Sequence, residues 1–136
     1  MDRAWWVKYY ADAAKTFAGD LVTICSYGKK TKQVRGNYGL NSGAGALCFA
    51  VNSGAARVIL LGYDCSYAQD GKRHWHGDHP AGLGNCGSIK KFPRQFADIC
   101  ATLGSAEIVN ASRSTALDVW PVVDLDAALG GEAWQN

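Results

Sequence analysis

The sequence lacks a long hydrophobic run and an excess of charge of either sign. No apolar stretch approaches the roughly 18 residues that a membrane-spanning helix needs. The N-terminal segment places Lys8 and Asp12 among its aromatics, so it offers neither the apolar core nor the cleavage site of a secretory signal. Its 14 basic and 12 acidic residues give a formal net charge of +2, which provides no global field for nucleic acid. We therefore expect a protein that is not exported, does not cross a membrane and does not bind nucleic acid.

The sequence also has few prolines, and it has no C-x-x-C motif. The chain has 3 prolines against 16 glycines without a period of three, and 48% of its residues are apolar, which excludes a collagen-like or disordered chain. The 5 cysteines are odd in number and form no C-x-x-C pair, so we expect reduced thiols and a cytoplasmic protein. A length of 136 residues fits a single domain over residues 1–136, whose core needs no disulfide or metal.

Hydrophobic periodicity predicts alternating helices and strands. Helical spacing of apolar residues predicts helices over 2–17, 43–54, 88–103 and 124–129. Short apolar runs rich in β-branched residues predict strands over 21–25, 57–62 and 106–111. The first helix carries an aromatic stripe that we expect to be buried, formed by Trp5, Trp6, Tyr9, Tyr10 and Phe17. From residue 64 to 87 neither period is present, and loops of this length usually carry function or are disordered.

This order of elements predicts an α/β fold with a short parallel sheet of about three strands. Such a fold is Rossmann-like with three layers, and it resembles the second half of a doubly wound domain. Three parallel strands leave an open sheet edge, and the aromatic stripe is wider than one small sheet face can hide. We therefore predict a two-fold symmetric homodimer, with helix 2–17 or an edge strand at the contact.

Polar side chains follow each predicted strand, at the edge where parallel sheets bind ligands. The helix start at Asn41, Ser42 and Gly43 presents unpaired N–H groups, which favour a phosphate or a carboxylate. The basic residues that we expect beside this helix start are Lys29, Lys30 and Arg113. The alternative is a helix cap packed on a sheet beside a solvated basic loop.

The string His74-Trp75-His76-Gly77-Asp78-His79 fits H-x-H-x-D-H, the metal-binding signature of the metallo-β-lactamase fold. These side chains could hold two metals for a zinc-dependent hydrolysis, or one metal with Cys86 or Asp78 as a further ligand. Against the match to that fold, the fold is longer and needs histidines downstream, and this sequence has no histidine outside residues 74–79. The remaining alternative is a polar loop ordered by hydrogen bonds around Trp75. We predict no stoichiometric zinc and no cofactor.

Three segments carry a resemblance to known proteins: Asn41-Ser42-Gly43, Val58-Ile59-Leu60-Leu61-Gly62-Tyr63-Asp64 and His74-Trp75-His76-Gly77-Asp78-His79-Pro80. There the chain resembles bacteriophage-encoded proteins of unassigned activity, which look related to the domain family of the archaeal 6-hydroxymethylpterin diphosphokinase and the motility-accessory glycosyltransferases. It is similar, more distantly, to the sialyltransferases of glycosyltransferase family 42. Members of that domain family usually begin with a strand and a G-P-S-type loop before the aromatic helix. Neither precedes the helix here. The resemblance therefore implies that this chain has only half of the nucleotide site that those family members have.

The resemblance also implies roles for individual residues. Ser42 and Gly43 would contact the donor nucleotide or its phosphate, and Asp64 would hold the strand end or a ligand hydroxyl. One of His74, His76 and His79 would act as a general base, because the pKa of histidine lies near working pH. Tyr63 and Tyr67 would donate hydroxyls to a phosphate, with a packing role as the alternative.

Taken together, these features predict a phage-type domain that binds a nucleotide or nucleotide-sugar and is related to glycosyl and diphosphoryl transferases. One alternative is a non-catalytic protein that sequesters a small nucleotide, and the other is a zinc-dependent hydrolase. Metal content separates the hydrolase from the other two, and recovery of unmodified ligand separates sequestration from catalysis.

Overall fold

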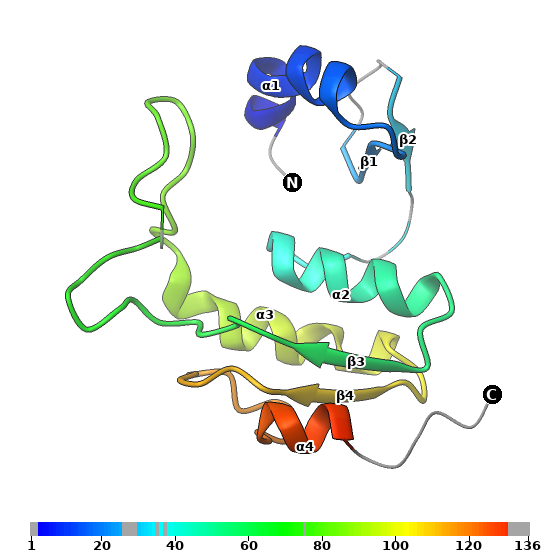
Figure 1. Cartoon of the computed structure of the whole chain (residues 1–136), viewed down its shortest axis with the longest axis vertical. Coiled ribbons are helices and arrows are strands. Elements are labelled where there is room, and N and C mark those ends of the chain that lie inside the picture. Colours follow the sequence, from blue (N-terminus) through cyan, green and yellow to red (C-terminus); the bar gives the residue numbers. More distant parts are fainter. Residues whose placement is uncertain (1–2, 26–29, 35, 37, 75, 131–136) are drawn as a thin grey trace.

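A computed structural model describes residues 3–25, 30–34, 36, 38–74 and 76–130 of the chain. Its helices are α1 (Arg3–Thr16), α2 (Ser42–Asn52), α3 (Phe92–Ile99) and α4 (Leu125–Gly130). Its strands are β1 (Val22–Thr23), β2 (Lys32–Gln33), β3 (Arg57–Leu60) and β4 (Glu107–Asn110). The chain is therefore a mixed helix and strand protein, and Figure 1 shows how these elements are arranged.

Three of the four predicted helices form close to their predicted bounds, and the one predicted over 88–103 is divided into three parts. A 3₁₀ turn, η1 (Ile89–Lys91), precedes α3, and a second 3₁₀ turn, η2 (Cys100–Thr102), follows it. Pro93 lies in the first turn of α3, where its missing N–H costs no helical hydrogen bond. The segment thus continues in one direction, but its hydrogen-bond pattern changes twice.

β3 and β4 pair in parallel, as the sequence predicts for these two segments. Arg57 is opposite Glu107 at the start of the ladder, and the two side chains form an ion pair at 3.2 Å. The other edge of β4 is partly covered by the chain that returns before α4, because Asn110 N–H donates to the Pro121 carbonyl at 2.8 Å. Val122 makes a parallel bridge to Asn110 at this edge.

The predicted three-stranded sheet is not formed by the described residues, because β1 pairs with β2 instead of with β3. Lys32 N–H donates to the Leu21 carbonyl at 2.8 Å, and Val34 N–H donates to the Thr23 carbonyl at 2.9 Å. A partner so near in sequence satisfies the backbone of β1 at a small loop-closure cost. The result is two separate parallel sheets of two strands each, and β2 is a strand that the sequence did not indicate.

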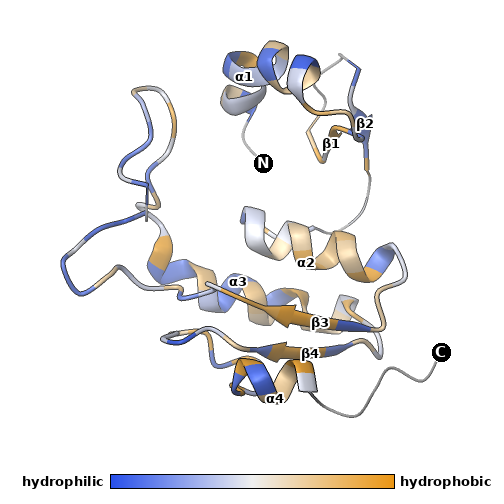
Figure 2. Cartoon of the chain, in the orientation of Figure 1, coloured by the Kyte–Doolittle hydropathy of each residue, from blue (hydrophilic) through white to orange (hydrophobic). Residues whose placement is uncertain are grey.

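The hydrophobic core lies between the β3–β4 sheet, α2 and α3. Its most completely buried side chains include Leu47 from α2, Phe96 and Ile99 from α3, and Leu117 from the segment after β4. Figure 2 shows the hydrophobic residues concentrated on β3, β4 and α2, whereas the long segment between β3 and η1 is mainly hydrophilic. The polar segment therefore follows the carboxyl end of β3, a strand whose sheet packs against the hydrophobic core.

α1 departs from the expected buried stripe. Of its described residues only Trp6 is buried, at 3% exposure, whereas Trp5 is 37% exposed and Phe17, just after the helix, is 57% exposed. Trp5 instead packs edge-on against the Trp6 ring, with centroids 5.1 Å apart. The stripe is only partly covered because α1 lies near β1 and β2, away from the β3–β4 sheet (Figure 1). No helix within the described ranges combines the length and apolar character needed to span a bilayer.

Candidate functional site

The segment from Asp64 to Ser88, here called the histidine loop, leaves the carboxyl end of β3 and returns to the start of η1. Together with the beginning of α2 it lines a cleft of about 490 Å³, in which Tyr63, Asp64 and Cys65 follow shortly after the end of β3. α2 contributes Asn41 and Gly43 to the same cleft, and the loop contributes Arg73, His74 and Cys86. A second cleft of about 520 Å³ shares Asn41, His74 and Cys86 with the first. The two clefts form the candidate site.

The N-terminal end of α2 is organised by Asn41. Its side-chain Oδ1 accepts a hydrogen bond from Ala44 N–H at 2.8 Å, and its Nδ2 donates to Gln95 Oε1 on α3 at 2.9 Å. The N–H groups of Ser42 and Gly43, in the first turn, have no acceptor within the helix. These two groups are therefore available for an anion at the positive end of the helix dipole.

Gly43 is required for close packing at this point. A Cβ at Gly43 would lie 3.0 Å from the Tyr63 ring and 3.1 Å from the Phe96 ring. The Tyr63 and Phe96 rings are themselves packed edge to face, with centroids 5.7 Å apart. Glycine here lets the helix end approach the aromatic floor of the cleft.

The segment after β4 holds the end of β3 in place. Tyr63 N–H donates to Ser112 Oγ at 2.8 Å, and Thr115 Oγ1 donates to the Tyr63 carbonyl at 2.7 Å. Ser112 and Thr115 belong to the polar run that follows the third predicted strand. By bonding the backbone of Tyr63, they position a residue that lines the first cleft. Arg113, between them, is exposed and is not a lining residue of either cleft.

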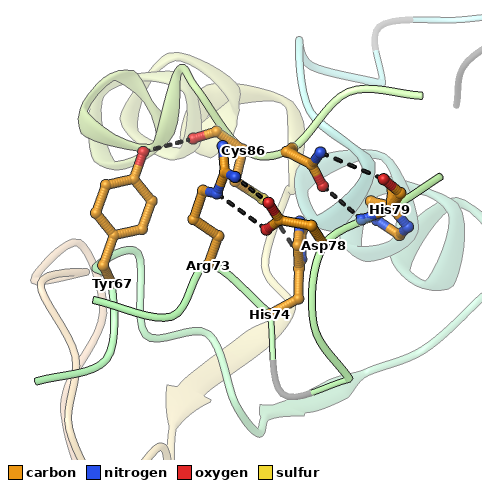
Figure 3. Close-up of polar contacts among 7 residues, drawn as sticks. Tyr67, Arg73, His74, Asp78, His79 and Cys86 are labelled. Carbon is orange, nitrogen blue, oxygen red and sulfur yellow. Dashed lines mark hydrogen bonds and ion pairs between the residues drawn. The ribbon is translucent and has the colours of Figure 1, made fainter. Parts of the chain in front are cut away.

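Two side-chain contacts tie the histidine loop together. Arg73 and Asp78 form an ion pair with two contacts, of which Nε to Oδ1 measures 3.0 Å. Asn85 brackets His79, because its Oδ1 accepts from His79 N–H at 2.6 Å and its Nδ2 donates to the His79 carbonyl at 3.5 Å. Figure 3 shows these contacts together with that of Tyr67, whose hydroxyl donates to the Cys86 carbonyl at 3.1 Å. The Arg73–Asp78 pair thus links the residues on either side of His74 and His76, and Asn85 holds the backbone of His79.

The three imidazole rings lie against one another. Ring centroids are 5.2 Å apart for His74 and His76, 4.4 Å for His74 and His79, and 5.0 Å for His76 and His79. The Nδ1 atom of His74 lies 3.8 Å from Cys86 Sγ, and the buried Nε2 atom of His74 has no hydrogen-bond partner among the described residues. Burial lowers the pKa of His74 below its ordinary value, and the neighbouring His79 and His76 lower this pKa further. The uncharged ring is therefore favoured at this position.

Two cysteines in the cleft have an unusual backbone. Cys65 and Cys86 both have φ of 51°, in the left-handed region that non-glycine residues rarely adopt, and both line the first cleft. Burial, with a contribution from the Asp64 carboxylate, raises the pKa of the Cys65 thiol to about 11, and burial also raises the pKa of Cys86. Both thiols are thus poor nucleophiles near neutral pH.

The structure brings most of the predicted site residues together. Asn41, Gly43, Tyr63, Asp64 and His74 line the first cleft, and Ser42 and His79 line the second.

The other predicted residues are placed differently. Lys30 is exposed and its N–H donates to the Tyr10 hydroxyl at 3.2 Å, so it lines neither cleft, and the Tyr67 hydroxyl is engaged with Cys86. Lys29 and Trp75 lie outside the described residues. The basic group that does line the cleft is Arg73, which the sequence did not single out. The only feature of the sequence that could have indicated Arg73 as a site residue is its position directly before His74.

Comparison of the chain with protein-family models, with curated proteins and with solved structures gives no match. The function is therefore argued from the geometry of the site and from its chemistry.

Proposed function

We propose that this protein binds a small nucleotide or nucleotide-sugar in the cleft between the start of α2, the end of β3 and the histidine loop. The observation that carries the proposal is that the Ser42–Gly43 end of α2 opens onto clefts that are also lined by Arg73 and His74. The two backbone N–H groups without an acceptor in the helix suit a phosphate, and so do the guanidinium N–H groups of Arg73 that its contacts with Asp78 through Nε and Nη2 leave over.

The walls of the first cleft support a nucleoside as the rest of the ligand. Tyr63, Phe92 and Phe96 give it an aromatic side, and Ile89 adds apolar surface. A base can pack against such rings, while the Asp64 carboxylate, which is exposed at the rim, can accept a hydrogen bond from a ribose hydroxyl. The resemblance to glycosyl and diphosphoryl transferases favours the same ligand class.

The proposal includes the finer fold assignment. Ligands of doubly wound sheets bind beyond the carboxyl ends of the strands, and the cleft occupies that position relative to β3. We therefore interpret the β3–β4 sheet with α2 and α3 as the Rossmann-like half of such a domain, in which the phosphate binds at the start of α2, the helix that precedes β3.

The test is nucleotide binding by two variants of Ser42, whose side chain is exposed. We expect CMP or ADP to raise the melting temperature of the protein, because a ligand at 100 times its Kd stabilises the folded state by about 2.7 kcal/mol. Ser42→Asp places a negative charge at the phosphate position, yet it suits the helix dipole, so it should abolish the shift without unfolding α2. Ser42→Asn is the uncharged control and should retain most of the shift.

Two results would overturn the proposal: no shift with any nucleotide tested, or equal shifts for the two Ser42 variants. Gly43→Asp is the less useful variant because its side chain would press on Tyr63 and Phe96 and disturb the fold itself. Mass analysis of the ligand after incubation separates transfer from sequestration, since a sequestering protein returns the nucleotide unchanged.

A further inference from the structure

The three histidines of the chain form a compact cluster of ring nitrogens. Each of His74, His76 and His79 offers one nitrogen, and these nitrogens all lie within 4.8 Å of one another. In a tetrahedral zinc site with Zn–N bonds of about 2.0–2.1 Å, ligand nitrogens are separated by roughly 3.3 Å. Small side-chain rotations would therefore bring all three nitrogens onto one metal ion.

The surroundings of the cluster hold its members in place. The Arg73–Asp78 ion pair spans the segment that contains His74 and His76, and Asn85 fixes the backbone of His79 on both sides of its peptide unit. Cys86 Sγ lies beside Nδ1 of His74, which leaves the buried Nε2 as the atom without a hydrogen-bond partner among the described residues (Figure 3). A buried ring nitrogen that lacks a partner is the arrangement that a metal ion completes.

The chemistry of the donors selects the kind of metal. The three imidazoles supply nitrogen, and the nearest loop carboxylate, Asp78, is already engaged with Arg73. Neutral imidazole suits zinc and its neighbours among the divalent transition metals, whereas magnesium and calcium require oxygen ligands. A cluster of three histidines also leaves one tetrahedral position for water or for a ligand, which is the arrangement of catalytic zinc sites.

We propose that His74, His76 and His79 bind one zinc-type divalent metal ion through their ring nitrogens, with a fourth position open to the cleft. The fourth position faces the cleft because His74 and His79 line the second cleft beside Asn41 and Ser42. This site goes beyond the proposed nucleotide binding and does not depend on it. The sequence led us to expect a metal-free loop, because further histidines downstream are missing and because of the resemblance to other proteins. The grouping of the three ring nitrogens within 4.8 Å of one another is the observation that leads us to propose a metal site instead.

The experiment uses the full chain, stripped with a chelator and then given Zn²⁺ alone. We expect about one zinc per chain to remain after gel filtration. His76→Ala and His79→Ala should each weaken zinc binding by about a hundredfold or more, because each removes one of three ligands. Lys72→Ala, an exposed change in the same loop, is the matched control and should retain the metal. Circular dichroism confirms that each variant is folded.

Cobalt(II) distinguishes this site from binding by the cysteines. The Co²⁺ form should show the visible spectrum of a four-coordinate ion and lack the near-ultraviolet band of a thiolate ligand, and Cys86→Ser should leave both features unchanged. In the unmodified protein, the ring-nitrogen resonances of all three histidines should move on Zn²⁺ addition, which tests the site even if a variant fails to fold.

The proposal is overturned by a thiolate band, by zinc retained in His76→Ala, or by histidine resonances that do not move. A parallel nucleotide titration in chelator separates the two proposals, since nucleotide binding at the α2 end needs no metal and should persist there.

Discussion

At the scale of single residues, Asn110 connects the core to the candidate site. It is completely buried; its Nδ2 donates to Thr115 Oγ1 at 3.2 Å and to the Leu117 carbonyl at 3.3 Å, and its Oδ1 accepts from Ser112 N–H at 3.0 Å. Ser112 and Thr115 in turn hold the backbone of Tyr63. One buried amide therefore fixes the segment that positions the wall of the cleft.

We predict that Asn110→Ala lowers the free energy of unfolding by about 2–4 kcal/mol, because it leaves buried polar partners without a hydrogen bond. Urea denaturation measures the loss. Ser114→Ala, an exposed change in the same segment, is the control and should stay within about 0.5 kcal/mol of the unmodified protein. Similar losses for both variants would show that the amide network contributes little.

At the scale of elements, α2 does two things at its N-terminal end. Asn41 caps the helix and also links it to α3 through Gln95. The cap residue is predictable from sequence, because a polar side chain before an apolar helical pattern is typical of this position. The link to Gln95 is not predictable, because it joins residues 54 positions apart.

We expect Asn41→Ala to lower stability by about 1–2 kcal/mol through loss of the cap and of the bond to Gln95. Gln95→Ala removes only the second interaction and should cost less. Denaturation of both single variants and of the double variant forms a cycle, and a coupling energy of about 0.5 kcal/mol or more is the expected result. Strictly additive losses would contradict an energetic link between α2 and α3.

At the scale of the whole molecule, the exposed apolar surface bears on assembly. Leu40 is 81% exposed and Phe17 is 57% exposed, and a mainly apolar cleft of about 250 Å³ lies between the β1–β2 pair and α2. Such surface on a small protein favours an interface. The homodimer expected from the sequence stays a prediction, with the uncovered part of the stripe at the contact.

Phe17→Glu should convert the dimer to a monomer at micromolar concentration, because it places a charge in the apolar contact. Light scattering after gel filtration measures the mass, and Lys15→Glu is the control on the exposed polar side. Trp6→Glu is not a suitable test of the contact, since Trp6 is buried and its replacement would destabilise the fold. A monomeric unmodified protein would contradict this prediction.

The sequence by itself determined the local structure of this protein. Hydrophobic periodicity located α1, α2, β3 and β4 to within a few residues, and the parallel pairing of β3 with β4 followed from the helices between them. It also placed the helix start at Asn41–Gly43 and the histidine loop at the same end of the sheet, because both follow from where strands end. The positions of helices, strands and strand ends depend on residues that are close together in the sequence, so the order of residues along the chain is enough to predict them.

Only the tertiary structure decided the partners between distant segments. The pairing of β1 with β2, the exposure of Phe17 and the choice of Arg73 instead of Lys30 at the cleft depend on how segments pack, which periodicity does not encode. The histidine loop has no period at all, so the meeting of its three rings follows from the Arg73–Asp78 and Asn85–His79 contacts that close it. Side-chain contacts across a loop fix positions in space that spacing along the chain leaves open.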